Sequence, residues 1–308
     1  MHRHFAITVP SGATDSLLDE LQRMSGVVAV AVHPGASVQP PGDVVSVQAL
    51  NRAADAVLVA VERAVPHGSL SVTSSQVSSL SDRDHAAGVV GDTDESTWED
   101  ATTALRHHAQ VTRNSVSLMF VGGVVAACAL FSSSATQPTG LVAAAVIAPG
   151  FEPLAKLGLG LVLRRRGILF RALRSAAVGY FVLAAAGALT MLVMRAAGTD
   201  LPDRFVRNRQ VLELADPTTV ALVISACGAL AGVIMVAAHR VTLLAGPLIA
   251  LQLIPAAAMT GMALAFDEGH LAAEGLARLG VDAGMVIAAG LLVFGAKAVI
   301  THRRQPLP

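Results

Sequence analysis

Long runs of residues without charge dominate the chain after Arg113. The stretches from Val116 to Phe131 and from Val178 to Met194 contain no acidic or basic residue. A helix needs about 20 mostly apolar residues to cross the hydrocarbon core of a bilayer. Backbone groups in lipid must be hydrogen-bonded within their own segment. The sequence therefore predicts a polytopic α-helical membrane domain over residues 115–304.

Segments of the required length occur six times, so we expect about six transmembrane helices. Two of them contain internal prolines and are expected to be broken helices, because proline cannot donate a backbone hydrogen bond. The predicted spans are Ser115 to Ser134, Thr139 to Leu163, Ala172 to Met194, Pro217 to Ala238, Val241 to Phe266 and Val281 to Ile300.

Cationic residues predict the orientation of these spans. They gather in alternate loops, and the positive-inside rule assigns these loops to the cytoplasmic side of the membrane. Two loops are expected on the opposite side, a charge-mixed one from Arg195 to Asp216 and a mostly acidic one from Asp267 to Asp282. No signal peptide is recognisable after Met1, so we expect a multi-pass protein of the cell inner membrane with both termini cytoplasmic. The residues behind this prediction are Arg106, Arg113, Arg164, Arg165, Arg166, Arg171, Arg174, Arg240, Arg303 and Arg304.

The first 77 residues alternate between apolar and polar in short stretches, as in a soluble domain. Strands and helices are expected in the order β-α-β-β-α-β, which is the order of a ferredoxin-like α+β fold. The second strand should end at the turn-prone His33-Pro34-Gly35. Expected strands are Phe5 to Val9, Val27 to Val32, Val44 to Ala49 and Ser69 to Val77, and expected helices are Thr14 to Met24 and Asn51 to Val65.

Between this domain and the first span, residues 78–98 are rich in Ser, Asp and Gly. Such a composition predicts an acidic flexible linker. Ser96-Thr97-Trp98-Glu99 has the pattern of a capping box, which opens a helix. We therefore expect a juxtamembrane helix over residues 99–114.

Several classes of function find no support in the composition. The formal net charge is zero and no basic tract occurs outside short loops, so we expect no nucleic acid partner. Cys128 and Cys227 each lie inside an apolar run and are expected to pack as small hydrophobic residues. No motif of a hydrolase, metalloprotease or P-loop enzyme occurs in its required context. We expect no enzyme activity, no cofactor and no metal.

Two predicted spans are interrupted at comparable places. Ile147 to Pro153 contains two prolines and interrupts the second span, while Gly246-Pro247 and Leu253-Ile254-Pro255 interrupt the fifth. Paired interrupted helices in the two halves of a membrane domain indicate a midplane binding site between structural repeats. Simple helix kinks are the alternative interpretation.

Charged residues inside the spans add to this hypothesis. A lone carboxylate such as Glu152 near the middle of a span costs at least a few kcal/mol unless it is neutralised or paired, and Lys156 one turn later could pair with it. The only lysines of the chain are Lys156 and Lys297, and a buried lysine can lose its proton where arginine cannot. For Lys297, near its helix end, we favour snorkelling to the membrane surface. The predicted site comprises Pro149, Gly150, Glu152, Pro153, Lys156, Gln252, Pro255 and Lys297.

At these residues the sequence resembles the bacterial membrane family known as domain of unknown function 389, over roughly Ser115 to Ile300. The family's Ala-Pro-Leu-Met-x-Pro motif is matched by residues 148–153, Ala-Pro-Gly-Phe-Glu-Pro. Its later Ile-Ala-x-x-Leu-x-Pro segment is matched by residues 249–255, and Lys297 stands where the family has asparagine. The resemblance implies a membrane domain without a named activity.

We therefore expect a transporter or ion-translocating protein, because broken helices and charges within the membrane are costly features that an anchor does not require. A membrane-embedded sensor, in which the front domain binds a ligand or partner, is the alternative. Expected partners are the lipid bilayer, further copies of the chain in a homo-oligomer, and an unknown small solute or ion.

Overall fold

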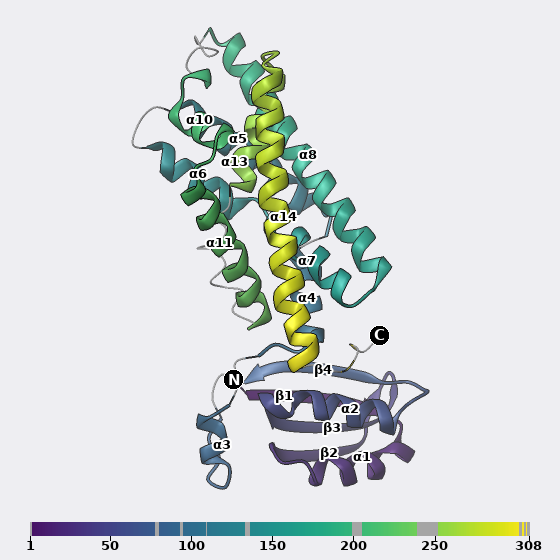
Figure 1. The fold of residues 1–308 in the computed structure, drawn as a ribbon. Coiled ribbons are helices and arrows are strands. Elements are labelled where there is room, and N and C mark those ends of the chain that lie inside the picture. Colours follow the sequence, from purple (N-terminus) through teal and green to yellow (C-terminus); the bar gives the residue numbers. More distant parts are fainter. Residues whose placement is uncertain are drawn as a thin grey trace. The chain divides into compact units, whose positions relative to one another are not determined.

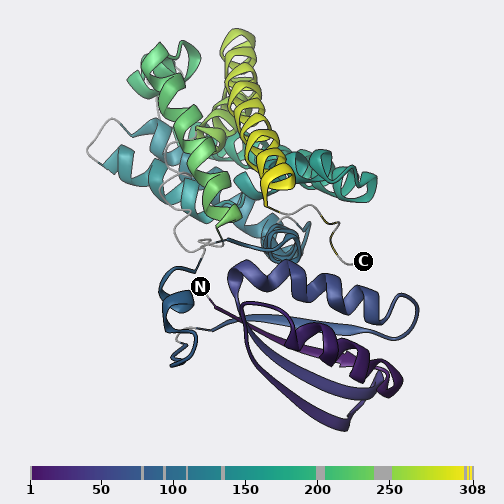
Figure 2. The same ribbon diagram turned by 60° about the horizontal axis from the view of Figure 1, so that its bottom comes forward.

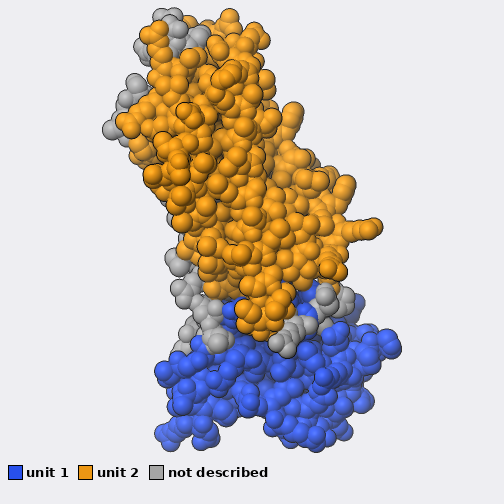
Figure 3. Space-filling model, viewed as in Figure 1, with its two compact units in different colours: residues 1–99, 302–308 blue, residues 100–301 orange. Residues whose placement is uncertain are grey.

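The computed structural model describes residues 2–77, 80–92, 95–108, 110–132, 136–198, 205–238 and 252–301, together with Arg304 and Pro306. Two compact units are distinguished (Figure 3). The front unit comprises residues 1–99 and 302–308, and the helical unit comprises residues 100–301.

Four antiparallel strands form the sheet of the front unit, in the order β2-β3-β1-β4. Helices α1 and α2 cover one face of this sheet (Figure 2). Side chains alternate between the two faces of a strand, so Phe5, Ile7 and Val9 point toward the helices and are fully buried. The predicted order of strands and helices is confirmed. The elements are β1 (His2–Val9), α1 (Thr14–Gln22), β2 (Val27–Val38), β3 (Pro41–Leu50), α2 (Ala54–Ala64) and β4 (Ser71–Val77).

Strand β2 is longer than predicted. It continues through His33-Pro34-Gly35, where the sequence predicted a turn, and the chain reverses between the paired residues Val38 and Pro41. The strand lies at the edge of the sheet, and its register is irregular between His33 and Ser37. Proline is tolerated at such a place because no ladder hydrogen bond needs its missing N–H.

The Asp43 carboxylate holds three segments of the front unit together. It accepts hydrogen bonds from Thr14 Oγ1 (2.7 Å), from Ser11 Oγ (2.8 Å) and from the backbone N–H of Gly35 (2.8 Å). Donors of this kind favour the ionised form, with Thr14 contributing most, so the pKa of Asp43 lies below its usual value.

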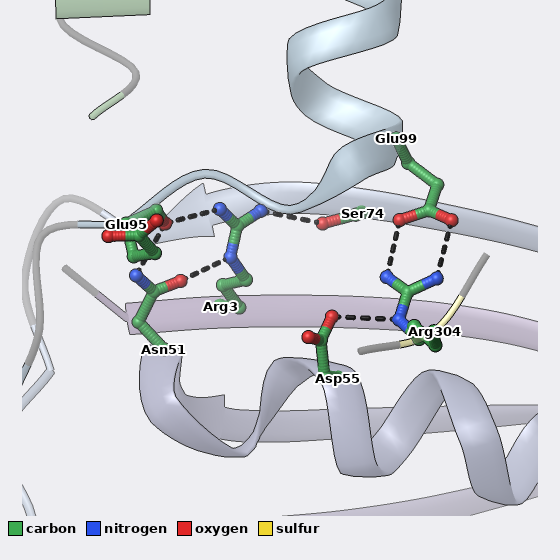
Figure 4. A network of polar contacts seen from close by, with 7 residues as sticks. All are labelled: Arg3, Asn51, Asp55, Ser74, Glu95, Glu99 and Arg304. Carbon is green, nitrogen blue, oxygen red and sulfur yellow. Dashed lines mark hydrogen bonds and ion pairs between the residues drawn. The ribbon is translucent and has the colours of Figure 1, made fainter. Parts of the chain in front are cut away.

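The described parts of the predicted linker are bonded to the sheet domain. Asp92 accepts from the backbone N–H groups of Asn51 (2.7 Å) and Arg52 (3.2 Å), directly before α2. Buried Arg3 donates to the Asn51 side chain and to the backbone oxygen of Glu95 (Figure 4). A short helix, α3 (Ala86–Val90), also forms here. These contacts anchor the segment, which differs from the flexible linker expected.

The end of the chain takes part in a second polar network of the front unit. Arg304 donates from Nη1 and Nη2 to the two carboxylate oxygens of Glu99, at 2.8 and 2.6 Å (Figure 4). Its Nε donates to Asp55 Oδ1 on α2 at 2.7 Å. Paired parallel hydrogen bonds of this kind are stronger and more directional than a single ion pair.

Helices make up the helical unit (Figure 1). By length and composition, α5, α8, α11 and α14 could each cross a membrane, and the pair α6 and α7 could form one further span with a bend of 46°. The described residues thus contain four or five candidate spans. The helices are α4 (Trp98–His108), α5 (Arg113–Phe131), α6 (Thr136–Ile147), α7 (Phe151–Val162), α8 (Arg166–Ala196), α10 (Arg209–Ala215), α11 (Thr219–Ala237), α13 (Leu253–Leu264) and α14 (Gly269–Ile300).

Two predictions about these helices are met only in part. The first part of the fifth predicted span, including Gly246 and Pro247, lies outside the described residues, as does Arg240 before it, and only α13 represents that span. The juxtamembrane helix is shorter than the predicted range 99–114, because α4 ends at His108 and a new helix starts at Arg113. The Thr112 side chain caps this new helix by accepting from Ser115 N at 3.1 Å.

The last helix departs most from the prediction. Helix α14 begins at Gly269, whereas the predicted span began at Val281. Most of the predicted acidic loop is therefore helix, and Arg278 and Asp282 lie well inside it. The prediction was wrong because it left Arg278 in a loop that ended at Asp282, just inside the predicted span, although opposite charges four residues apart neutralise each other on one helix face.

Glycines let the helices of this unit approach closely. A Cβ atom at Gly261 of α13 would lie 1.8 Å from the backbone oxygen of Ala184 in α8. A Cβ atom at Gly187 of α8 would lie 2.7 Å from the backbone oxygen of Ala258 in α13. Small residues at such crossings let the two helix backbones pack closely.

Candidate functional site

The predicted break in the second span is confirmed. Helix α6 ends at Ile147 and α7 begins at Phe151, and Pro149 and Gly150 lie between them. The Gly150 N–H donates to the Ala148 oxygen at 2.8 Å. The Gly150 oxygen accepts from the Tyr180 hydroxyl of α8 at 2.9 Å. Tyr180 thus satisfies a backbone group that the interrupted helix leaves open, as apolar surroundings require.

The start of α13 lies against this break. A Cβ atom at Gly150 would lie 2.9 Å from Ile254 Cδ1 and 3.2 Å from the Tyr180 hydroxyl, so a larger residue would collide there. Pro255 is the third residue of α13, where proline is tolerated because the first turn needs no N–H donor. The described parts of the two predicted proline regions therefore meet in space.

Charged residues follow the break directly. Glu152 and Pro153 occupy the first turn of α7 and Lys156 the second, and all three are buried. Only 9% of Glu152 and 5% of Lys156 are exposed. A carboxylate in the first turn of a helix is stabilised by the positive end of the helix dipole. Lys156 lies one turn from Glu152 on the same side of α7.

A second group of buried charges was missed by the sequence reasoning. Arg278 and Asp282 of α14 are 4% and 0% exposed, and Arg278 Nε donates to Asp282 Oδ2 at 3.2 Å. Arg278 Nη2 donates to Ser225 Oγ of α11 at 2.7 Å. The backbone N–H of Gln252, the cap residue of α13, donates to the same Asp282 Oδ2 at 3.0 Å. The pair thereby joins three helices.

The two charged groups meet at the start of α13. Ile254 of this helix lies against Gly150 beside Glu152, and Gln252 two residues earlier donates to Asp282. The break after α6, the first turn of α7, the start of α13 and the middle of α14 therefore form one polar centre. We call Gly150, Glu152, Tyr180, Gln252, Arg278 and Asp282 the charged centre.

Two oxygens of the charged centre stand out. Asp282 Oδ1 and Glu152 Oε2 are buried, and neither atom makes a hydrogen bond with any residue that the structure describes. Buried polar atoms almost always have a partner, so an exception points to strain or function. Among the described residues no group of three potential metal ligands occurs.

Lys297 lies apart from the charged centre. It is about four turns of α14 from Asp282, at 3.6 residues per turn. Only 5% of it is exposed, and its Nζ donates to the backbone oxygen of Ala237, the last residue of α11, at 2.8 Å. A cation is favourable at a helix C-terminus. Snorkelling of Lys297 to the membrane surface stays a prediction, with its ammonium group buried against the end of α11.

Comparison with known families identifies the central part of the chain. Residues 145–288 match the family model described as "Domain of unknown function (DUF389)". This stretch includes the break after α6 with Pro149 and Pro153, the start of α13, and the Arg278–Asp282 pair. It ends before Lys297. No curated protein and no solved structure matches the chain.

Proposed function

Since residues 145–288 belong to the DUF389 family, whose name records no activity, we propose a function from the charged centre itself. The chain is a multi-pass inner-membrane protein that moves a small solute or an ion across the bilayer. Its binding site lies between the break after α6 and the start of α13.

The observation that carries this proposal is the charged centre. It combines buried Glu152, Arg278 and Asp282 with the break between α6 and α7 and with the short helix α13. The surrounding helices are apolar enough to span a membrane. Charges within a bilayer cost several kcal/mol each and are typically found along substrate or ion pathways. In transporters, half-helix ends near the midplane supply the groups that bind substrate.

Further parts of the proposal concern orientation and assembly. The start of α8 and the end of α14 lie at the same end of the helical unit (Figure 1), and both carry cationic residues. This arrangement supports a cytoplasmic location for that end and for both termini. The antiparallel strand order supports a ferredoxin-like front domain, and we propose a homo-oligomer.

A sensor is the second candidate, and one observation favours it. Arg304 follows α14 closely in the chain and is bonded to Asp55 and Glu99 of the front unit. A ligand that moves α2 in the front domain would therefore disturb the chain directly after α14. A sensor of this kind needs no path for water through the helical unit.

Accessibility to water distinguishes the two functions. In a background with Cys128→Ala and Cys227→Ala, we expect Ile254→Cys to react with a membrane-impermeant thiosulfonate reagent. Ile254 is 3% exposed and lies at the break, so the reaction requires a water-filled path. A transporter exposes its site alternately, so the reagent should succeed from either side of the membrane.

Met262→Cys is the matched control. Met262 is fully buried two turns further along α13, and its replacement by the smaller cysteine causes no collision. We expect it to stay unreactive while the protein is folded. Equal protection of both cysteines from both sides would mean a sealed core, and it would favour the sensor.

A further inference from the structure

We propose that Asp282 binds and releases a proton as the binding site is exposed first to one side of the membrane and then to the other. The proton binds at the Oδ1 atom of Asp282. This proposal rests on the transport function and names its coupling ion. In the forward step, an O–H bond forms between Oδ1 and a proton delivered by water from one side. In the reverse step, this bond breaks and the proton leaves to water on the other side.

The two oxygens of Asp282 differ in a way that suits this role. Oδ2 accepts hydrogen bonds from Arg278 Nε and from the backbone N–H of Gln252. Oδ1 makes no hydrogen bond with any of the described residues, although it is buried. A proton can therefore bind at Oδ1 without displacing a donor from Oδ2.

Protonation would change the contact between two helices. The ionised carboxylate lies at the N-terminus of α13, where the helix dipole and the free N–H groups stabilise a negative charge. A neutral carboxyl group loses most of this stabilisation, and Arg278 is left without its counter-charge. Proton binding thus weakens the attachment of α13 to α14 beside the break after α6.

A proton fits this position better than a metal cation does. Arg278 lies within hydrogen-bonding distance of the carboxylate, and the positive end of α13 faces the same oxygen. Both repel a cation that must approach as a full charge. A proton instead forms a covalent bond and cancels the charge of the carboxylate.

The charged and titratable groups on the helices around Asp282 are as follows. Helix α13 has none, α11 contributes the exposed Cys227, and α10 has the exposed pair Arg209 and Glu213. Glu152 on α7 is the competing carboxylate, because its Oε2 is also buried without a hydrogen bond to the described residues. The other groups are Lys156 on α7, Arg166, Arg171, Arg174, Tyr180 and Arg195 on α8, and His270, Glu274, Arg278 and Lys297 on α14.

Infrared difference spectroscopy on the full chain in lipid vesicles tests the proposal. The pH is changed between about 4 and about 10, which covers the range of perturbed carboxylates, and the C=O stretch of a protonated carboxyl group is recorded. We expect a band that titrates in the unaltered protein and is lost in Asp282→Asn. The band should shift in Asp282→Glu, which keeps a carboxyl group if the asparagine variant fails to fold.

Two control variants separate this result from other carboxylates. Glu274→Gln changes a partly exposed carboxylate two turns away on α14, and Glu152→Gln removes the competing one. Both should keep the band. Its loss in Glu152→Gln but not in Asp282→Asn would overturn the proposal, as would the absence of a titrating band or its dependence on sodium instead of pH. Labelling of Ile254→Cys tests transport separately, so failure of proton binding alone leaves the transport function standing.

Discussion

Gly261→Ala is expected to destabilise the helical unit by about 3 kcal/mol, the upper end of the range for overpacking. The added methyl group would lie 1.8 Å from the backbone oxygen of Ala184. A backbone atom in the middle of α8 cannot rotate away as a side chain can, so the two helices must separate. The melting temperature in detergent and the yield of monodisperse protein measure the effect.

Gly284→Ala is the matched control for this prediction. Gly284 also lies inside a long helix, α14, but no atom is found within 4 Å of the position of an added Cβ. Because alanine is the better helix former, the control should be neutral or more stable by up to about 1 kcal/mol. Equal melting temperatures of the two variants would contradict the close approach of α8 and α13.

Arg278→Met is expected to cost about 3–5 kcal/mol, because it leaves the buried charge of Asp282 without its partner. A second change, Asp282→Leu, should recover most of this loss, since replacing a whole buried pair by apolar residues is often nearly neutral. Melting temperatures of the two single variants and the double variant form a double-mutant cycle.

The exposed pair Arg209 and Glu213 provides a control with the same spacing. Its side chains are four residues apart on α10 and the Arg209 side chain is 89% exposed. Arg209→Met should therefore change stability by only about 0.5 kcal/mol. The buried pair would be disproved if Arg278→Met were equally mild, or if the effects of Arg278→Met and Asp282→Leu simply added.

Local patterns in the sequence were sufficient for much of the fold. Alternation predicted all four strands of the front domain, and proline predicted the break between α6 and α7. The sequence pattern did not reveal that β2 lies at the edge of the sheet, where proline is tolerated. Pro34 was therefore interpreted as part of a turn that ends the strand. Position within a sheet depends on residues far away in the chain, here on the pairing of β1 with both β3 and β4.

The charged centre was only half predicted for a similar reason. Gly150, Glu152 and Gln252 were named, but Arg278 was assigned to a loop and Asp282 to the end of that loop. Their spacing of four residues with opposite sign was a signal that could have been used. The contact of Tyr180 with Gly150 left no such signal, because it joins two helices through tertiary packing alone.

The loop before α11 was also interpreted too simply. Residues 195–216 were expected to be a charge-mixed loop, yet Phe205, Val211 and Leu214 are buried in the core of the helical unit. Apolar residues spaced through a charged segment indicated this only weakly. What the sequence lacks in each of these cases is the identity of the packing partner.

Labelling introduced cysteines from each side of the membrane is the most direct test of whether the helical unit crosses it. In the background without native cysteines, Arg166→Cys and Glu268→Cys place exposed thiols at the first residue of α8 and directly before α14. An impermeant thiol reagent should label the first from the cytoplasmic side only and the second from the opposite side only. Labelling of both cysteines from the same side would contradict the predicted crossing of the membrane.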